Sequence, residues 1–232
     1  MDGWQDLTRV FREFEESDQR ILVIRGAGDD FCAGADLDPS RINEFQTVTD
    51  RHRRMKIVGE TALTLHRLNK PTIAAVDGVA VGAGMNLALG CDIVLATARS
   101  RFSEIFVRRG LTLDFGGSWI LPRIVGIQRA KELALTGRIV SGEEASQIGM
   151  VTKLVEPDHL EDAAISMASE LAKGAPKAQM FAKQTLNASF GMSLEDALSW
   201  EGQSQAILLG TEDAAEGVMS FNEKRDPEWK GR

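Results

Sequence analysis

The sequence predicts an α/β fold, in which strands and helices alternate along the chain, followed by a region made of helices. Three short apolar runs, at residues 20–26, 71–78 and 91–97, have the length and the branched side chains of buried strands. Segments with a helical pattern lie between them, and from residue 118 onward the pattern is mainly helical. Strand, helix and strand in repeated order indicate layers of helices packed on a sheet.

The first expected element is an amphipathic helix. Its apolar side chains recur at near-helical spacing and are Trp4, Leu7, Val10, Phe11 and Phe14. The run at 20–26 predicts the first strand. A segment with helical pattern follows over 45–69 and stops before Pro71. We interpret its basic run RHRRMK, at 51–56, as a solvated helix face rather than a binding patch.

The strands expected at 71–78 and 91–97 come next, and one more short strand is expected at 151–156. Helices are expected over 128–137, 141–149, 158–174, 176–190 and 193–210. Ser141 with Glu144 has the spacing of a capping box, and Ser193 with Asp196 has it in a weaker form. We therefore predict an α/β core over 1–175 and a helical region over 176–232.

Composition limits the classes of function. The chain has 232 residues, a net charge of −7 and a pI near 5.1, and 43% of it is hydrophobic, which suffices for a well-buried core. The acidic balance argues against nucleic-acid binding, which depends on clustered Lys and Arg. The sequence has neither a signal peptide nor an apolar run long enough to span a membrane, so we expect a cytoplasmic protein. Cys32 and Cys91 are expected to be buried free thiols in a reducing compartment.

Sequence motifs for metals and nucleotides fail. The histidines His52, His66 and His159 lie in helical segments without metal-ligand spacing, and for His66 a structural role is favoured over catalysis. After Gly82 and Gly84, the third glycine of a dinucleotide fingerprint is replaced by Leu87. We therefore expect no metal and no permanently bound cofactor.

Two glycine-rich turns follow strands and open segments with a helical pattern: FCAGADL at 31–37 and GVAVGAGMNLALG at 78–90. The first N–H groups of a helix have no partner within it, so such a turn can bind an anion or a developing oxyanion. A ligand carbonyl could approach the backbone closely at the small residues Ala33, Gly34, Ala35, Gly82, Ala83 and Gly84. The alternative is that the glycines only close tight turns.

Asp114 is the least expected residue of the segment GLTLDFGGSWILPR, at 110–123. A carboxylate among leucines, an aromatic residue and paired glycines costs several kcal/mol if it is buried without a partner or a use. Two interpretations stay open from the segment alone. Asp114 is either a turn or helix-capping residue, or a group that moves a proton.

Four segments resemble the enoyl-CoA hydratase/isomerase superfamily, also called the crotonase superfamily. They are FCAGADL, KPTIAAVDGVAVGAGMNLALGCDIVLAT, FSEIFVRRGLTLDFGGSWILPRIVG and ALTGRIVSGEEASQIGMVTKLV, and the resemblance runs in order over nearly the whole chain. It implies a crotonase-like α/β core of stacked β-β-α turns, with C-terminal helices used in trimer assembly. It also implies acyl-CoA thioesters as substrates.

The resemblance also assigns residues to the site. Ala35 and Ala83 match the two positions whose backbone N–H groups form the family's oxyanion hole. In the family, the stretch that borders the adenine and pantetheine matches Ala33, Asp36 and Leu37 here, and Gly34 and Gly84 are assigned to the same substrate site. Lys224 and Arg225 match a region that approaches the CoA phosphates in the family, although a solvated charge pair is an equal alternative.

The departures from the family decide the reaction that we predict. Hydratases carry two glutamates at the positions of Asn86 and Phe106, whereas Glu104 is two residues away from the matching position and receives no role. Asp114 matches the proton-transferring aspartate of dienoyl-CoA isomerases and of ring-isomerising members of phenylacetate degradation. A dry wall formed by Phe106, Phe115 and Trp119 would raise its basicity.

We therefore predict an enoyl-CoA isomerase in which Asp114 is the base and Ala35 and Ala83 hold the enolate oxygen, with Asn86 and Phe106 in the substrate site. The first alternative is an enoyl-CoA hydratase, and the second is a non-catalytic homologue that binds acyl-CoA or RNA. A homotrimer or a dimer of trimers is expected, because residues 176–209 carry apolar side chains on more than one helix face. A β-hairpin that precedes the first helix in family members has no counterpart in the sequence.

Overall fold

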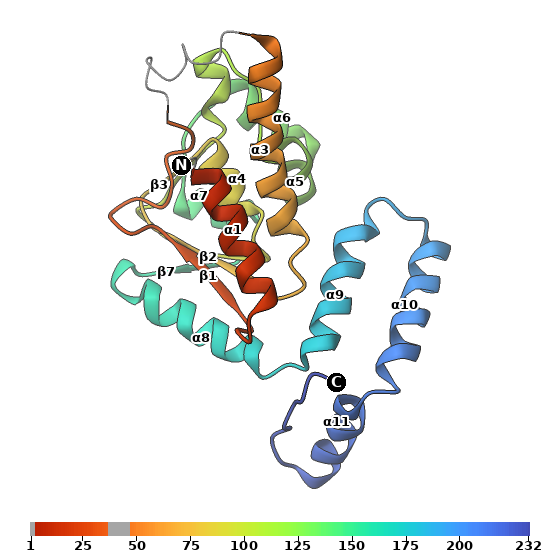
Figure 1. Ribbon diagram of the computed structural model, residues 1–232. Coiled ribbons are helices and arrows are strands. Elements are labelled where there is room, and N and C mark those ends of the chain that lie inside the picture. Colours follow the sequence, from red (N-terminus) through yellow and green to blue (C-terminus); the bar gives the residue numbers. More distant parts are fainter. Residues whose placement is uncertain (1–2, 37–46) are drawn as a thin grey trace.

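The computed structural model describes residues 3–36 and 47–232, and its core is built on two small sheets (Figure 1). The larger sheet is parallel, with strand order β1-β2-β4-β7, and consists of β1 (Leu22–Arg25), β2 (Thr72–Val76), β4 (Ile93–Thr97) and β7 (Lys153–Val155). The smaller sheet has the order β3-β5-β6 and consists of β3 (Val79–Val81), β5 (Arg101–Ser103) and β6 (Val140–Ser141). The four strands of the larger sheet are those that the sequence predicts.

Helices cover these sheets. Those of the core are α1 (Gly3–Glu16), α3 (Val48–His66), α4 (Ala83–Leu89), α5 (Gly117–Val125), α6 (Ile127–Thr136), α7 (Gly142–Gln147) and α8 (Leu160–Ala172), with the 3-10 turns η1 (Ile105–Arg109) and η2 (Pro157–His159). In the described part of the chain, no helix combines the length and the apolar character that crossing a membrane requires.

Burial corrects several expectations of the sequence. The strands β2 and β4 are buried almost throughout, whereas β1 lies at the sheet edge and its exposure alternates, which leaves Val23 36% exposed. In α1, Trp4, Phe11 and Phe14 join the core, but Val10 is 40% exposed because it lies outside the face that packs on α3. Both cysteines are free thiols; Cys91 is buried and Cys32 is only half-buried.

Of the two predicted capping boxes, the one at Ser141 is incomplete and the one at Ser193 is complete. Ser141 caps α7 by accepting a hydrogen bond from the Glu144 N–H, but the Glu144 carboxylate pairs with Arg138 at 2.6 Å. The complete box is the one at Ser193, where the side chains of Ser193 and Asp196 each accept a hydrogen bond from the backbone of the other. The spacing in the sequence does not reveal that Arg138 competes for Glu144.

The C-terminal helices form an arm that extends from the core: α9 (Pro176–Ser189), α10 (Leu194–Leu208) and α11 (Glu212–Glu223) (Figure 1). The helix α9 is fastened to the core, because the Lys183 ammonium pairs with Asp92 at 2.7 Å and donates to the Lys70 carbonyl. Beyond it, α10 packs against α9, and the buried Asp213 of α11 accepts hydrogen bonds from backbone N–H groups of Lys230 and Gly231. The predicted boundary at residue 176 thus coincides with the start of α9, although α9 itself contacts the core.

Candidate active site

The short helix α4 is the centre of the candidate site, and all seven of its residues are buried. It begins directly after β3 at Gly82, which has a φ of 55° that favours glycine, and the Gly82 N–H donates to the Ser103 carbonyl at 2.9 Å. The next residue, Ala83, is 2% exposed. Within the described residues, no hydrogen bond uses its N–H, so this donor remains available at the positive end of the helix.

The first glycine-rich turn lies beside α4. The Cys32 N–H donates to the Val79 carbonyl, and the Val81 N–H donates to the Cys32 carbonyl at 3.1 Å. Gly84 permits this approach, because a Cβ at that position would overlap the Cys32 carbonyl. The two turns therefore converge.

The turn ends with the residues expected to border a ligand. Ala33, Ala35 and Asp36 are exposed and Gly34 is half-buried with a φ of 86°. The Ala35 N–H enters no hydrogen bond with the described residues, so it is a second available donor beside that of Ala83. Leu37, which the sequence also assigns to the substrate site, lies outside the described residues.

Asp114 lies in the loop between η1 and α5, and its carboxylate does not cap a helix. The N-cap of α5 is Gly116, and only the main-chain carbonyl of Asp114 serves the turn, by accepting from the Gly117 N–H at 2.9 Å. The carboxylate oxygen Oδ1 is buried and has no hydrogen-bond partner among the described residues. Burial raises the pKa of Asp114 to about 6, because the charged form loses its hydration. The side chain of Asp114 therefore does not cap the helix, whereas its main chain does take part in a turn.

Asn86 joins α4 to this loop. Its side chain is fully buried, and Nδ2 donates to the Asp114 carbonyl at 3.0 Å and to Glu104 Oε2 at 3.3 Å. Gly117 packs directly on the amide, since a Cβ there would overlap all three of its terminal atoms. Asn86 thus links the helix that carries Ala83 to the loop that carries Asp114.

Glu104 is the site residue that the sequence does not identify. It follows β5 directly and is 1% exposed. The pKa of Glu104 is raised to about 7, chiefly because burial removes the hydration of the charged form; the hydrogen bond from Asn86 lowers it, and the charge of Asp114 adds a smaller increase. An acidic residue inside the apolar run FSEIF indicates a buried carboxyl group, but no feature of the sequence shows that this group contacts Asn86.

The aromatic residues expected around Asp114 divide into three environments. Phe106 is 8% exposed and its ring lies against Gly82, the residue before Ala83. Phe115 has a φ of 48° and places its ring in the core, 5.2 Å from that of Trp4. Trp119 instead contacts His66 and Arg123, and it borders a cleft between the core and α9.

Lys224 is not brought to the site within one chain. It ends α11 with a φ of 55°, at the far end of the arm from α4 (Figure 1). Its neighbour Arg225 is paired with Glu216 and Glu223. The segment that carries Lys224 and Arg225 therefore follows α11 in the arm, apart from α4 (Figure 1).

The geometry combines two backbone donors at converging turns with a partly dehydrated carboxylate tied to the same helix. Preorganised N–H groups stabilise an oxygen that becomes negative during a reaction, and a carboxylate with a raised pKa is a stronger base than usual. Such a site can remove a proton next to a carbonyl group.

Comparisons with known proteins agree with this geometry. The family model described as "Enoyl-CoA hydratase/isomerase" matches residues 3–232. The chain is 35% identical over 227 residues to the short-chain-enoyl-CoA hydratase of Clostridium acetobutylicum, which covers 97% of this chain and 85% of that protein. It is 36% identical over 228 residues to the 1,2-epoxyphenylacetyl-CoA isomerase of Escherichia coli, with 97% and 87% covered.

A solved structure extends the similarity to three dimensions. The enoyl-CoA hydratase of Bacillus anthracis superposes with a TM-score of 0.92 at 32% identity, over 99% of this chain and 88% of that one. The predicted crotonase-like α/β fold with its helical C-terminal region is thereby confirmed. The chain belongs to the enoyl-CoA hydratase/isomerase family.

Proposed function

We propose that this protein is an acyl-CoA isomerase that shifts a carbon–carbon double bond, with Asp114 as the base. The observation that carries the proposal is the buried Asp114 oxygen without a hydrogen-bond partner, on a loop fastened to α4. The relative from Escherichia coli that is named an isomerase supports it. Asn86 and Phe106, at the positions of the hydratase glutamates, cannot activate water, since an amide has negligible basicity and a phenyl ring has none.

The proposed reaction needs one base and one oxyanion site. In a 3-enoyl thioester, the Asp114 carboxylate accepts a proton from C2, the carbon between the thioester carbonyl and the double bond. The electrons of the broken C–H bond move onto the thioester oxygen, which accepts hydrogen bonds from the N–H groups of Ala35 and Ala83. The Asp114 acid then returns the proton to another carbon of the enolate, and the double bond moves. Each backbone donor can contribute about 3–4 kcal/mol to such a transition state.

The substrate proposed here is a coenzyme A thioester, and the mechanism uses no resident cofactor. Ala33, Gly34, Asp36, Leu37 and Gly84 are proposed to border it, with Phe106 beside the reacting carbons. Lys224 ends α11, which lies in the arm away from α4 (Figure 1). Any contact that it makes is proposed to be with the CoA of a neighbouring copy in a trimer.

Hydration is the second candidate, because Glu104 supplies another carboxyl group near Asp114. Relatives named as hydratases also favour it. Against it, Glu104 is 1% exposed and accepts its hydrogen bond from Asn86, which leaves it without access to bulk water. The isomerase is therefore preferred.

The deciding experiment compares two reactions in the wild type and in Asp114→Asn, which keeps the shape of the side chain and removes the base. We expect 3-enoyl-CoA to be isomerised much faster than 2-enoyl-CoA is hydrated, and Asp114→Asn to lower isomerisation about 10²–10⁴-fold. Thermal stabilisation by a saturated acyl-CoA should be unchanged, because the variant still binds the ligand. Faster hydration in the wild type, or full isomerase activity in Asp114→Asn, would overturn the proposal.

A further inference from the structure

Glu104 is a buried acid that the proposed isomerisation does not use. Its side chain is 1% exposed, Oε2 accepts a hydrogen bond from Asn86, and Oε1 has no partner among the described residues. A buried carboxyl group is costly unless its interactions serve the structure or the reaction. Its contacts lead directly to the proposed base.

The Asn86 amide is the link between the two acids. A carboxamide has two N–H donors, and in Asn86 one acceptor is the Asp114 carbonyl and the other is Glu104 Oε2. Gly117 covers the amide so closely that no side chain fits between them. The orientation of the amide is therefore set from both sides, and removing Glu104 removes one of its two acceptors.

These contacts run from the end of β5, through α4, to the loop before α5. Asn86 is one helical turn beyond Ala83 on α4. Its amide therefore connects the loop that carries the proposed base to the helix that carries the proposed oxyanion donor. We propose that Glu104 is a positioning residue for Asp114: its carboxyl group holds the Asn86 amide, and the amide holds the main chain that carries the base. This inference rests on the proposed function of Asp114.

The charges around Glu104 add a second property. Among the described residues, Asp114 is the one charged side chain that shifts the Glu104 pKa. Near its main chain, the Arg108 guanidinium donates to the Thr136 carbonyl and Arg138 is paired with Glu132 and Glu144. The charge of Asp114 is one cause of the raised pKa of Glu104, so the two carboxyl groups are electrostatically coupled.

The first test separates kcat from KM in two substitutions. Glu104→Gln keeps an acceptor for Asn86, whereas Glu104→Met has a similar volume and no acceptor of that strength. At pH 6.5 we expect Glu104→Gln to retain kcat within about 3-fold and Glu104→Met to lose about 10- to 100-fold, with KM for 3-enoyl-CoA nearly unchanged. Glu16→Gln, an exposed control on α1, should leave both constants unchanged. Equal kcat in folded Glu104→Met and wild type, or equal losses in Met and Gln, would overturn the inference.

The second test asks whether Glu104 acts through Asn86. In an Asn86→Leu background the link is already broken, so adding Glu104→Met should change kcat by less than about 2-fold, in a double-mutant cycle. If Glu104→Met lowers kcat in that background by as much as it does alone, Glu104 acts by another route and the inference fails. Circular dichroism of each variant confirms that the comparison is made on folded protein.

The third test measures the proton on Glu104 without measuring activity. Infrared difference spectra follow the C=O stretch of protonated carboxyl groups, and the band that disappears in Glu104→Gln belongs to Glu104. We expect it to titrate near pH 7 in the wild type and at lower pH in Asp114→Asn, where the neighbouring charge is absent. The same midpoint in both proteins would refute the coupling. Loss of isomerase activity in Asp114→Asn would still uphold the proposed function, so the two failures are distinguishable.

Discussion

At the scale of single residues, the burial of Asp114 sets the pH range in which the proposed base is charged. A pKa raised to about 6 means that the group is protonated below that pH and cannot accept a proton from substrate. We therefore expect kcat/KM for isomerisation to fall about 10-fold per pH unit below about pH 6 and to level off above it. A profile of initial rates at low substrate concentration measures this limb. A limb near pH 4, the ordinary range for aspartate, would contradict the dehydrated environment.

Glu104 makes a separate prediction for stability. Its raised pKa favours the folded state at low pH, and this contribution is lost as pH rises from the ordinary value of 4.5 through about 7. One unit of pKa shift corresponds to about 1.4 kcal/mol. From pH 4 to pH 8, the free energy of unfolding of Glu104→Gln should therefore rise by about 3 kcal/mol relative to that of the wild type. Chemical denaturation of both proteins at the two pH values measures the difference. An identical effect of the substitution at both pH values would contradict the buried, ionisable state of Glu104.

The two acids also show how far the sequence predicts the site. Asp114 is conspicuous because its neighbours in the sequence are apolar, and the structure confirms that one of its oxygens is buried. The importance of Glu104 depends on Asn86, which is 18 residues away and meets it only through the fold. A local pattern can show that a charge is misplaced, but a partner on another element becomes visible only in three dimensions.

At the scale of elements, the site depends on the contact between the loop at Cys32 and α4. Gly84→Ala should disrupt it, because the added Cβ would overlap the Cys32 carbonyl, which belongs to the backbone and cannot rotate away. We expect a loss of about 1–3 kcal/mol in stability, a typical cost of overpacking, together with a loss of isomerase activity.

The matched control is Gly59→Ala in α3, where a Cβ meets nothing within 4 Å. Alanine has the higher helix propensity, so this substitution should raise stability by about 0.5–1 kcal/mol and leave activity unchanged. Thermal melting and initial rates of both variants check the pair. Equal melting temperatures for Gly84→Ala and the wild type would mean that the two turns are not in this contact.

The elements that the sequence misses share a physical cause. The strands of the smaller sheet have two or three residues, too few for an alternating pattern, and β3 lies within a segment dominated by glycine and small residues. The long apolar runs that form β2 and β4 are recognisable because strands buried on both faces need a continuous series of apolar side chains. Both glycine-rich turns were predicted, whereas the small sheet that joins the second turn to β5 was not.

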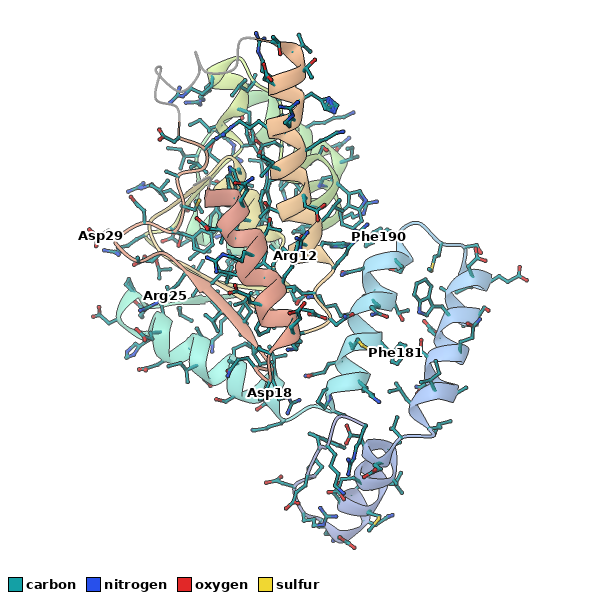
Figure 2. All side chains as sticks on the ribbon, viewed as in Figure 1. Arg12, Asp18, Arg25, Asp29, Phe181 and Phe190 are labelled. Atoms are coloured by element: carbon teal, nitrogen blue, oxygen red, sulfur yellow. The ribbon has the colours of Figure 1, made fainter. Side chains whose placement is uncertain are left out.

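At the scale of the whole molecule, the arm exposes more apolar surface than a single chain can cover. Phe190 contacts Arg123 of the core across the cleft, but it remains 67% exposed (Figure 2). Farther along the arm, large apolar side chains are more than half exposed at Leu194, Leu198, Ile207, Leu209, Val218, Met219 and Phe221. Exposed large apolar side chains in this number are typical of an interaction surface, and further copies of the chain are its proposed occupants.

We therefore expect the protein to sediment as a trimer, three times the 25.3 kDa of one chain, or as a dimer of trimers. Leu209→Glu and Phe221→Glu place charges where apolar side chains would be buried between copies, at a cost of several kcal/mol for each unpaired charge. Both variants should dissociate at micromolar concentration. Val48→Glu is the control, because Val48 is 77% exposed on α3 of the core rather than on the arm, and its mass should stay that of the wild type.

Analytical ultracentrifugation decides between these states, and activity measured on the same samples connects assembly to the site. If a neighbouring copy contributes Lys224 to the CoA, the dissociated Leu209→Glu variant should have a raised KM for the CoA thioester. Its KM for the same acyl group on a shorter carrier should stay that of the wild type. If the wild type stays monomeric at micromolar concentration, the proposal that the arm joins copies of the chain is wrong. If the wild type is a trimer and the dissociated variant has the same KM for the CoA thioester, the arm serves assembly alone.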